Sequence, residues 1–184
     1  MEIEKEIKVL LTKEEYESLQ KLFKWDEELK QTNYYYTDME GKINKDEVTI
    51  RVREKAQKLL LQIKRPRAFK NALHISDEYE VPIDRIPEKI DKKYIQQIVG
   101  GDIGNVELIG KMITYRKVYN WGEEVEICLD RNLYINKVDY ELEVEFINEI
   151  PSELVQTLND NNIYMDNIVD GKYKRFMSEL NAIR

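Results

Sequence analysis

The sequence predicts an α+β fold in which one antiparallel β-sheet or barrel carries helices at its periphery. Most of the 184 residues fall in segments where apolar and charged side chains alternate with period two, as they do along β-strands. Four other segments repeat apolar residues at helical spacing. Glycine and proline are scarce, at seven and four residues, and no low-complexity run or fixed-period repeat marks a boundary. We therefore expect one domain that spans residues 1–184.

The first half of the chain is expected to contain five strands and one helix. Residues 2–10 alternate, with charged side chains on one face and mostly apolar side chains on the other. A helix is expected over residues 12–25, where Thr12 and Glu15 have the spacing of a capping box. Residues 39–47 resemble a turn, and Pro82 is expected to end a strand. The other expected strands span residues 31–38, 48–55, 59–66 and 77–82.

The second half is expected to add three strands and three helices. A helix is expected over residues 87–101, because Pro87 suits a first helical turn and the glycines at 100 and 101 favour a helix end. Alternation with period two then resumes. The expected strands span residues 106–121, 123–130 and 138–146, and the expected helices span 152–160 and 172–180.

The composition excludes several kinds of site. The only cysteine, Cys128, rules out an intramolecular disulfide or a CxxC site, and the only histidine, His74, rules out a site with two imidazoles. We expect Cys128 to pack within a strand and His74 to lie in a loop. Catalysis would therefore depend on carboxylates, lysine, arginine and tyrosine.

The charge balance and the hydropathy pattern indicate the compartment and the partners. With 36 acidic and 29 basic residues, the formal net charge is -7, so the average surface repels nucleic acid and anionic lipid. No apolar run reaches the roughly 18 residues of a membrane-spanning helix, and the first residues do not resemble a secretory signal. We expect a cytoplasmic protein without nucleic-acid or membrane partners, and a homodimer is compatible with the sequence.

The charges are sorted by strand. Acidic residues dominate segments 2–8 and 139–145, whereas segments 48–54 and 60–66 carry cations. Carboxylates without histidine or thiolate suit Mg²⁺ or Mn²⁺, and clustered Arg and Lys suit a phosphate chain. A barrel with these faces inward would be a polar tunnel for metal and polyphosphate. The same alternation also fits a sheet with its charged face in water, or a barrel that takes an apolar ligand, and the pattern alone leaves these alternatives open.

Charged motifs along almost the whole chain resemble those of one protein family. Residues 4–8 read EKEIK, which is similar to the ExExK signature that opens the CYTH superfamily, the triphosphate tunnel metalloenzymes. The later motifs follow in the family order and are QTNYYYTD, TIRVRE, LLQIKRP, DEYEVP, IGKMITYRKVY, EICLDRNLY, DYELEVEF and DGKYKRF. The spacing looks most like that of the small bacterial single-domain members. The resemblance implies an eight-stranded antiparallel β-barrel tunnel, with its charged faces inward and its helices packed outside.

The resemblance also implies roles for individual residues. One or two Mg²⁺ or Mn²⁺ ions would be held by Glu4, Glu6, Asp130, Glu141 and Glu143. The triphosphate would be bound by Lys8, Arg51, Arg53, Lys64, Arg116, Lys172 and Arg175. The catalytic group would comprise Glu4, Glu6, Lys8 and Tyr35, with Tyr35 bonded to a phosphate oxygen or to Lys8. Glu78, Glu80 and Glu145 would support the site, whereas Lys111 and Glu126 are expected to be structural.

The implied activity is metal-dependent hydrolysis of a triphosphate, with inorganic tripolyphosphate cleaved to orthophosphate and pyrophosphate as the leading hypothesis. Thiamine triphosphatase, nucleoside or RNA triphosphatase and class IV-type adenylate cyclase chemistry are alternatives on the same tunnel. A non-catalytic sensor that binds polyphosphate or a nucleotide is an alternative of another class. Two departures from the family pattern concern local contacts: the order Thr37-Asp38 after the aromatic residues, and Gly171 before the C-terminal lysine.

Overall fold

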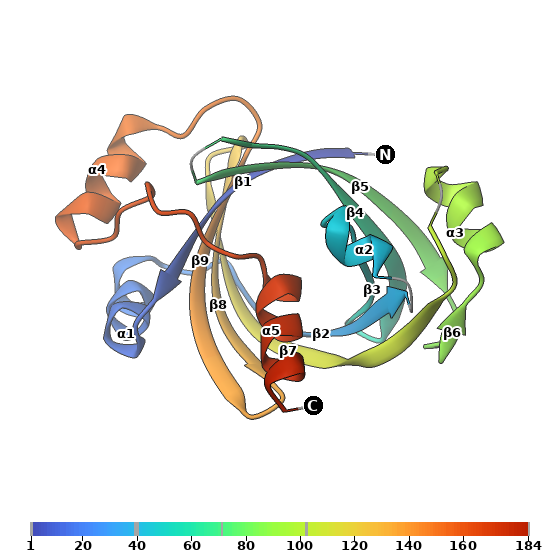
Figure 1. The fold of residues 1–184 in the computed structure, drawn as a ribbon. Helices are drawn as coiled ribbons and strands as arrows, with labels where there is room; N and C mark the ends of the chain where they lie inside the picture. Colours follow the sequence, from blue (N-terminus) through green and yellow to red (C-terminus); the bar gives the residue numbers. More distant parts are fainter. Residues whose placement is uncertain (1, 39–40, 71, 102, 184) are drawn as a thin grey trace.

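Eight antiparallel strands form a closed barrel in the computed structural model, which describes residues 2–38, 41–70, 72–101 and 103–183 (Figure 1). The barrel strands are β1 (Glu2–Leu11), β2 (Glu27–Asp38), β3 (Thr49–Lys55), β4 (Lys58–Lys70), β5 (Leu73–Ile83), β7 (Val106–Trp121), β8 (Val125–Tyr134) and β9 (Lys137–Phe146). Around the ring they follow the order β2-β3-β4-β5-β1-β9-β8-β7, and β7 pairs again with β2. Each barrel strand therefore has a partner on both sides, which removes the free edges of an open sheet.

The described residues form five helices around the ring of strands, and those of residues 42–45 and 172–182 lie across its opening in the view of Figure 1. The five helices are α1 (Lys13–Leu22), α2 (Lys42–Lys45), α3 (Lys92–Val99), α4 (Ser152–Asp160) and α5 (Lys172–Ala182). Apolar side chains of α1 and α4 form one buried cluster with the strands, and those of α3 and α5 form another. In the described part of the chain, no helix is long and apolar enough to cross a membrane.

Alternation along the strands places charged side chains inside the barrel and apolar side chains outside. In β3, Arg51 and Arg53 border the interior, whereas Ile50 and Val52 are fully buried in the cluster that contains Ile95 of α3. The predicted fold class, an eight-stranded antiparallel barrel with helices outside, is confirmed.

Local sequence signals account for how α1 begins and where α5 packs. Thr12 accepts a hydrogen bond from the Glu15 backbone while Glu15 accepts one from the Thr12 backbone, so the predicted capping box is present. The ring of Phe176 on α5 lies over Gly110 of β7, where a Cβ atom would be 2.8 Å from the ring. Gly110 also has a φ of +152°, so glycine is required for this close approach.

The helix expected over residues 87–101 begins five residues later, at Lys92. Asp91 caps it, since its side chain accepts a hydrogen bond from the Lys93 backbone at 2.7 Å. The preceding residues form β6 (Lys89–Ile90), which pairs with β7 on the flank of the barrel. A proline suited to a first helical turn was therefore a weaker signal than the aspartate cap.

Two further expectations about local structure were wrong. Within the segment expected to be a turn, residues 42–45 form the short helix α2, and residues 39 and 40 lie outside the described part of the chain. The strand expected over residues 77–82 is β5, which begins at Leu73 and continues past Pro82. Proline fits there because β1 pairs with β5 only as far as Glu78, so that side of β5 has no ladder to interrupt.

Candidate functional site

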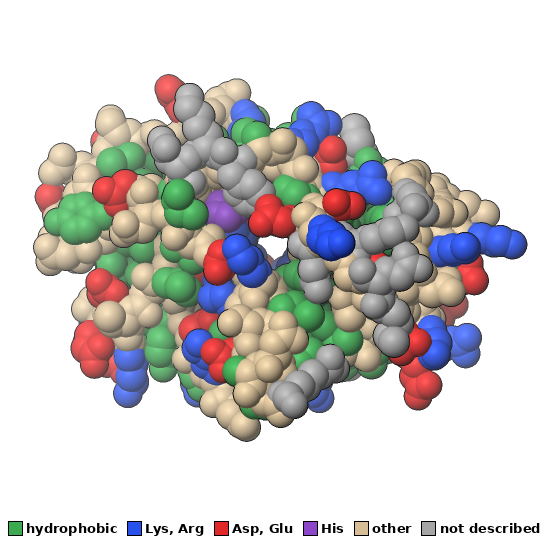
Figure 2. Space-filling view, in the orientation of Figure 1, with side chains coloured by type: hydrophobic (Ala, Val, Ile, Leu, Met, Phe, Trp, Pro, Cys, Tyr) green, Lys and Arg blue, Asp and Glu red, His purple; other side chains and the backbone are tan. Residues whose placement is uncertain are grey.

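The barrel encloses a cavity of about 630 Å³ whose wall carries both signs of charge. Figure 2 shows a hollow near the centre of one face, with acidic and basic side chains around it. The predicted site residues that line the cavity are Glu4, Glu6, Lys8, Tyr35, Arg51, Arg53, Lys64, Arg116, Glu143, Glu145 and Lys172. They come from β1, β2, β3, β4, β7, β9 and α5, so closure of the barrel brings together residues that are distant in the sequence.

Two lysines neutralise the carboxylates of the ExExK segment. Lys64 Nζ lies 2.8 Å from Glu6 Oε1 and also pairs with Glu4, while Lys8 Nζ lies 2.8 Å from Glu6 Oε2. Burial alone would raise the pKa of Glu6, but Lys64 and Lys8 outweigh it and lower that pKa to about 2. Glu6 is therefore ionised, and it holds both ammonium groups at the cavity wall.

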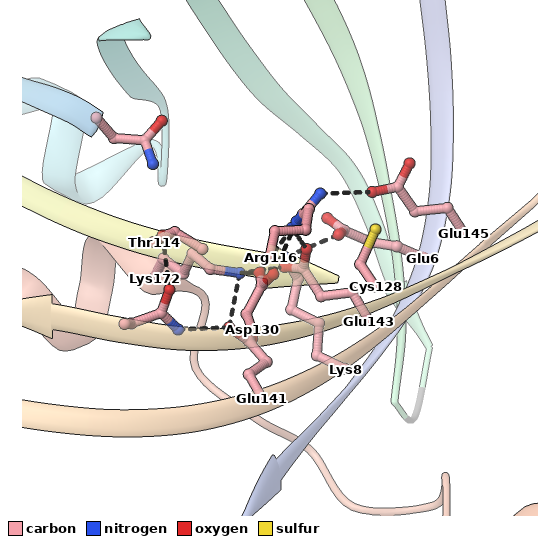
Figure 3. A network of polar contacts seen from close by, with 12 residues as sticks. Glu6, Lys8, Thr114, Arg116, Cys128, Asp130, Glu141, Glu143, Glu145 and Lys172 are labelled. Carbon is pink, nitrogen blue, oxygen red and sulfur yellow. Dashed lines mark hydrogen bonds and ion pairs between the residues drawn. The ribbon is translucent and has the colours of Figure 1, made fainter. Parts of the chain in front are cut away.

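A second set of carboxylates lies deeper, on β8 and β9 (Figure 3). Asp130 and Glu141 have no exposed surface, and Glu143 is 4% exposed. Lys172 Nζ lies 2.9 Å from Asp130 and 2.7 Å from both Glu141 and Glu143. Burial would raise the pKa of Glu143, but Lys172, Lys8 and Arg116 lower it well below its ordinary value. The ammonium group of Lys172 thus lies among three carboxylates, in a position that a metal ion could otherwise take.

Each carboxylate set has the donor chemistry of a divalent-cation site. Oxygen atoms of Glu4, Glu6 and Glu145 lie within 4.8 Å of one another, and so do those of Asp130, Glu141 and Glu143. All are hard oxygen donors, which suit Mg²⁺ or Mn²⁺. All three members of the first set border the cavity, whereas only Glu143 of the second set does, and Lys172 is in contact with every member of the second set. The residues fit a divalent cation, and the first set is the more accessible place for one.

Glu145 belongs to the first set, although it was predicted only as a supporting residue. Burial, followed by the neighbouring Glu4, raises the pKa of Glu145 to about 8. Its nearest cationic contact among the described residues is Arg116 Nη1 at 3.9 Å. A carboxyl group with so little compensation would gain more from a nearby cation than Glu143 would.

The arginines differ in how their charge is balanced. Arg116 forms a two-pronged contact with Asp130 at 2.8 and 2.7 Å and also pairs with Glu143. Arg51 pairs with Glu78 at 3.4 Å. In contrast, no carboxylate of the described residues lies within 4.0 Å of the Arg53 guanidinium. Burial and the proximity of Arg51 and Arg116 lower the pKa of Arg53 to about 10.

Several predicted site residues lie behind the cavity wall. Arg175 is buried against Asp139 at 3.0 Å and Glu141 at 2.8 Å, so it faces carboxylates and does not border the cavity. Glu78 and Glu80 accept hydrogen bonds from Arg51 and Gln62, respectively.

Tyr35 borders the cavity, and its hydroxyl group is 3.9 Å from the sulfur of Met112. The phosphate contacts of Arg175 and Tyr35 remain predictions.

The prediction that His74 lies in a loop was wrong. His74 is part of β5, where it pairs across the ladder with Glu6, and it borders the cavity. Burial, followed by Lys8, lowers the pKa of its imidazole. Cys128 is fully buried in β8, as expected for packing, and burial raises the pKa of its thiol.

Sequence reasoning also missed the buried amides of the interior. Asn33 and Gln62 are 0% and 2% exposed, and their side-chain oxygens accept hydrogen bonds from Arg53 and Arg51. Both occupy inward positions of the strand alternation. That inward position was the only signal in the sequence that could have identified them. They were missed because uncharged side chains do not stand out among so many charged ones.

Comparisons with known proteins agree on the family. The family model of the CYTH domain matches residues 2–167. A triphosphatase candidate from Bacillus subtilis (strain 168), YjbK, is 27% identical over 154 residues, which cover 78% of this chain and 77% of YjbK.

Solved structures share the fold. HpAC1 from Hippeastrum, an adenylyl cyclase candidate described as having a dominant triphosphatase activity, superposes with a TM-score of 0.76 at 21% identity, over 96% of each chain. An adenylate cyclase candidate from Bacillus halodurans superposes with a TM-score of 0.71 at 22% identity, over 95% of this chain and 97% of the other.

Proposed function

Because the chain belongs to the CYTH domain family, we propose that it is a divalent-metal-dependent triphosphatase that cleaves inorganic tripolyphosphate to orthophosphate and pyrophosphate. The observation that carries the proposal is the cavity itself, where a carboxylate set suited to a cation faces lysines and arginines from other strands. The triphosphatase role assigned by name to the candidate YjbK and the dominant triphosphatase activity described for HpAC1 support the same class of reaction.

The cationic side chains would bind and orient the triphosphate. Arg53, which lacks a carboxylate partner among the described residues, offers its guanidinium to phosphate oxygens, and Arg51 lies beside it on β3. Lys8 and Lys64 reach the same cavity from β1 and β4. Cleavage of a phosphoanhydride depends mainly on charge neutralisation and in-line positioning, so a buried array of fixed cations is suited to it.

The carboxylates would hold the cation and position water. Glu4, Glu6 and Glu145 offer the accessible oxygen donors. A divalent cation held there would polarise the phosphoryl oxygens and acidify a nearby water molecule. Ionised Glu6 keeps Lys8 and Lys64 at the wall of the cavity in which the triphosphate would bind.

Product-resolved turnover tests the proposal. The wild-type protein and the variants Glu6→Gln and Arg53→Ala are incubated with tripolyphosphate, ATP or thiamine triphosphate and with Mg²⁺ or Mn²⁺. We expect tripolyphosphate to be cleaved to orthophosphate and pyrophosphate, and both variants to lose turnover while they keep the wild-type circular dichroism spectrum.

Other outcomes would overturn part or all of the proposal. Faster turnover of thiamine triphosphate or ATP would replace the substrate and keep the reaction class. Cyclic AMP and pyrophosphate from ATP would indicate a cyclase. Tripolyphosphate binding that needs Arg53 without turnover of any substrate would indicate a sensor.

A further inference from the structure

Both arginines of β3 have their Nε–H group bound by the side-chain oxygen of a buried amide on a neighbouring strand. Arg53 Nε donates to Asn33 Oδ1 on β2 at 3.0 Å, and Arg51 Nε donates to Gln62 Oε1 on β4 at 2.7 Å. Each amide is the direct cross-strand partner of its arginine in the ladder. The two contacts therefore follow from strand register on both sides of β3.

This arrangement fixes the direction of each guanidinium. A guanidinium is planar, so a hydrogen bond at Nε restricts rotation of the whole group. The same bond directs the terminal N–H groups away from the amide. Both arginines border the cavity. The terminal N–H groups of Arg53 are then available for an anion, since no carboxylate of the described residues pairs with them.

The Asn33 side chain forms a hydrogen bond only through its oxygen atom among the described residues. It is 0% exposed, and its Nδ2 atom has no hydrogen-bond partner among the described residues. A buried N–H group without a partner lowers stability. The bond to Arg53 is the only side-chain hydrogen bond of Asn33 in the described structure. The amide therefore orients the arginine, while its own unpartnered N–H group lowers the stability of the fold.

A neutral amide differs from a carboxylate at this position. A carboxylate would also hold Arg53, but it would cancel the positive charge that a triphosphate needs and would repel the phosphates. On the other side of β3, Gln62 donates its own N–H to Glu80, which orients the amide so that its oxygen faces Arg51. Glu80 therefore acts on the cavity indirectly, because it orients Gln62, which in turn binds Arg51.

We propose that Asn33 and Gln62 are positioning residues that aim Arg53 and Arg51 at the triphosphate, and that Asn33 does so without placing a negative charge beside Arg53. The inference rests on the proposed triphosphatase function. The two uncharged amides would lie behind the charged residues of the cavity wall. Their loss should change the affinity for the substrate more than the rate of the chemical step.

Steady-state kinetics and binding of Asn33→Ala and Asn33→Asp test the inference. We expect Asn33→Ala to raise the KM for tripolyphosphate by about tenfold, with a smaller change in kcat, because Arg53 loses its orientation. Asn33→Asp keeps an acceptor of the same shape, and we expect it also to raise KM, because Arg53 gains an opposing charge. Binding of imidotriphosphate, an analogue with P–N–P bridges, in the presence of Mn²⁺ should weaken in parallel.

Gln31→Ala is the matched control, because Gln31 is another buried amide of β2 with an unpartnered nitrogen among the described residues, and it has no arginine contact there. We expect its KM to match that of the wild type. Unchanged KM in both Asn33 variants, with wild-type turnover intact, would overturn the inference and leave the proposed function standing. If Asn33→Ala does not fold, Asn33→Asp decides alone. Absence of turnover and of binding in the wild type would instead refute the proposed function.

Discussion

Lys172 Nζ lies 2.7 Å from Glu141 Oε2, although Lys172 opens α5 and Glu141 lies in the middle of β9. The contact joins the final helix to the barrel interior, and neither group is more than 6% exposed. Removal of one member of a buried ion pair leaves the other without compensation, which costs far more than loss of an exposed pair.

Substitution of Lys172 by methionine should therefore destabilise the protein strongly. Three buried carboxylates would lose their shared ammonium group, and we expect the free energy of unfolding to fall by about 3 kcal/mol or more. Urea denaturation without divalent metal measures the effect. Lys174→Met is the control, because Lys174 is an exposed residue of the same helix that pairs with Asp170. Equal stability of the two variants would contradict the prediction.

Lys64 competes with any cation for the same oxygens. Its ammonium contacts both Glu4 and Glu6, so Lys64→Met should let Mn²⁺ bind more tightly in the absence of substrate. Turnover of tripolyphosphate should nevertheless fall by about tenfold, because a phosphate ligand is lost. Isothermal titration with Mn²⁺ and a turnover assay measure the two effects. Weaker Mn²⁺ binding in the variant would show that Lys64 does not occupy the cation position.

The two carboxylate sets should respond differently to removal of one charge. Glu145→Gln should raise the Mn²⁺ concentration needed for half-maximal turnover, because Glu145 belongs to the set at the cavity. Glu141→Gln should instead lower stability, since Lys172 and Arg175 each lose one of their carboxylate partners, and should leave the Mn²⁺ requirement near that of the wild type. The reverse pattern would place the metal among Asp130, Glu141 and Glu143.

Gly110→Ala should disturb the contact between β7 and α5. The new Cβ atom would lie 2.8 Å from the Phe176 ring at a φ of +152°, so both sterics and backbone conformation oppose it. We expect the free energy of unfolding to fall by about 1–3 kcal/mol. Gly171→Ala is the control, because its Cβ atom would meet nothing within 4 Å and its φ is -62°. Thermal unfolding followed by circular dichroism distinguishes them.

Tyr36 should limit stability at alkaline pH. Burial, followed by Tyr34, raises its pKa to about 12, and its hydroxyl group donates to Pro87 O at 2.7 Å. Because the folded pKa is raised, this stabilisation is complete below the unfolded value of 10 and is lost as the pH rises through 12. Tyr36→Phe should flatten the fall in stability between pH 10 and 12, as measured by urea denaturation. Tyr94→Phe, at an exposed tyrosine of α3, should retain the wild-type slope.

The strands with long uninterrupted alternation could be predicted from the sequence. The predicted bounds of β7 and α4 match the structure residue for residue, although the β2–β7 ladder shifts register between Tyr35 and Tyr36. The β4–β5 hairpin was harder. Its ladder shifts register between Pro66 and Ala68, so the simple alternation on which the prediction relied breaks there, and His74 was consequently assigned to a loop.

The composition of the site was easier to predict than its pairing. Charge sorting pointed to Glu4, Glu6, Arg51, Arg53 and Lys64, but alternation alone could not tell which face points inward. The position of Lys172 among the carboxylates of β8 and β9 depends on how α5 packs, which no local pattern encodes. The amide at Asn33 was missed for the same reason, since its meaning lies in a cross-strand neighbour.

The seam between β2 and β7 has a consequence for biosynthesis. β2 ends at Asp38, and the strand that closes the barrel against it begins only at Val106. A ribosome adds about 5–20 residues per second, so that edge of β2 would have no pairing strand for several seconds after its synthesis. Pairing between segments so far apart is intrinsically slow. The barrel is therefore expected to close late, and the nascent chain carries an open β-edge until it does.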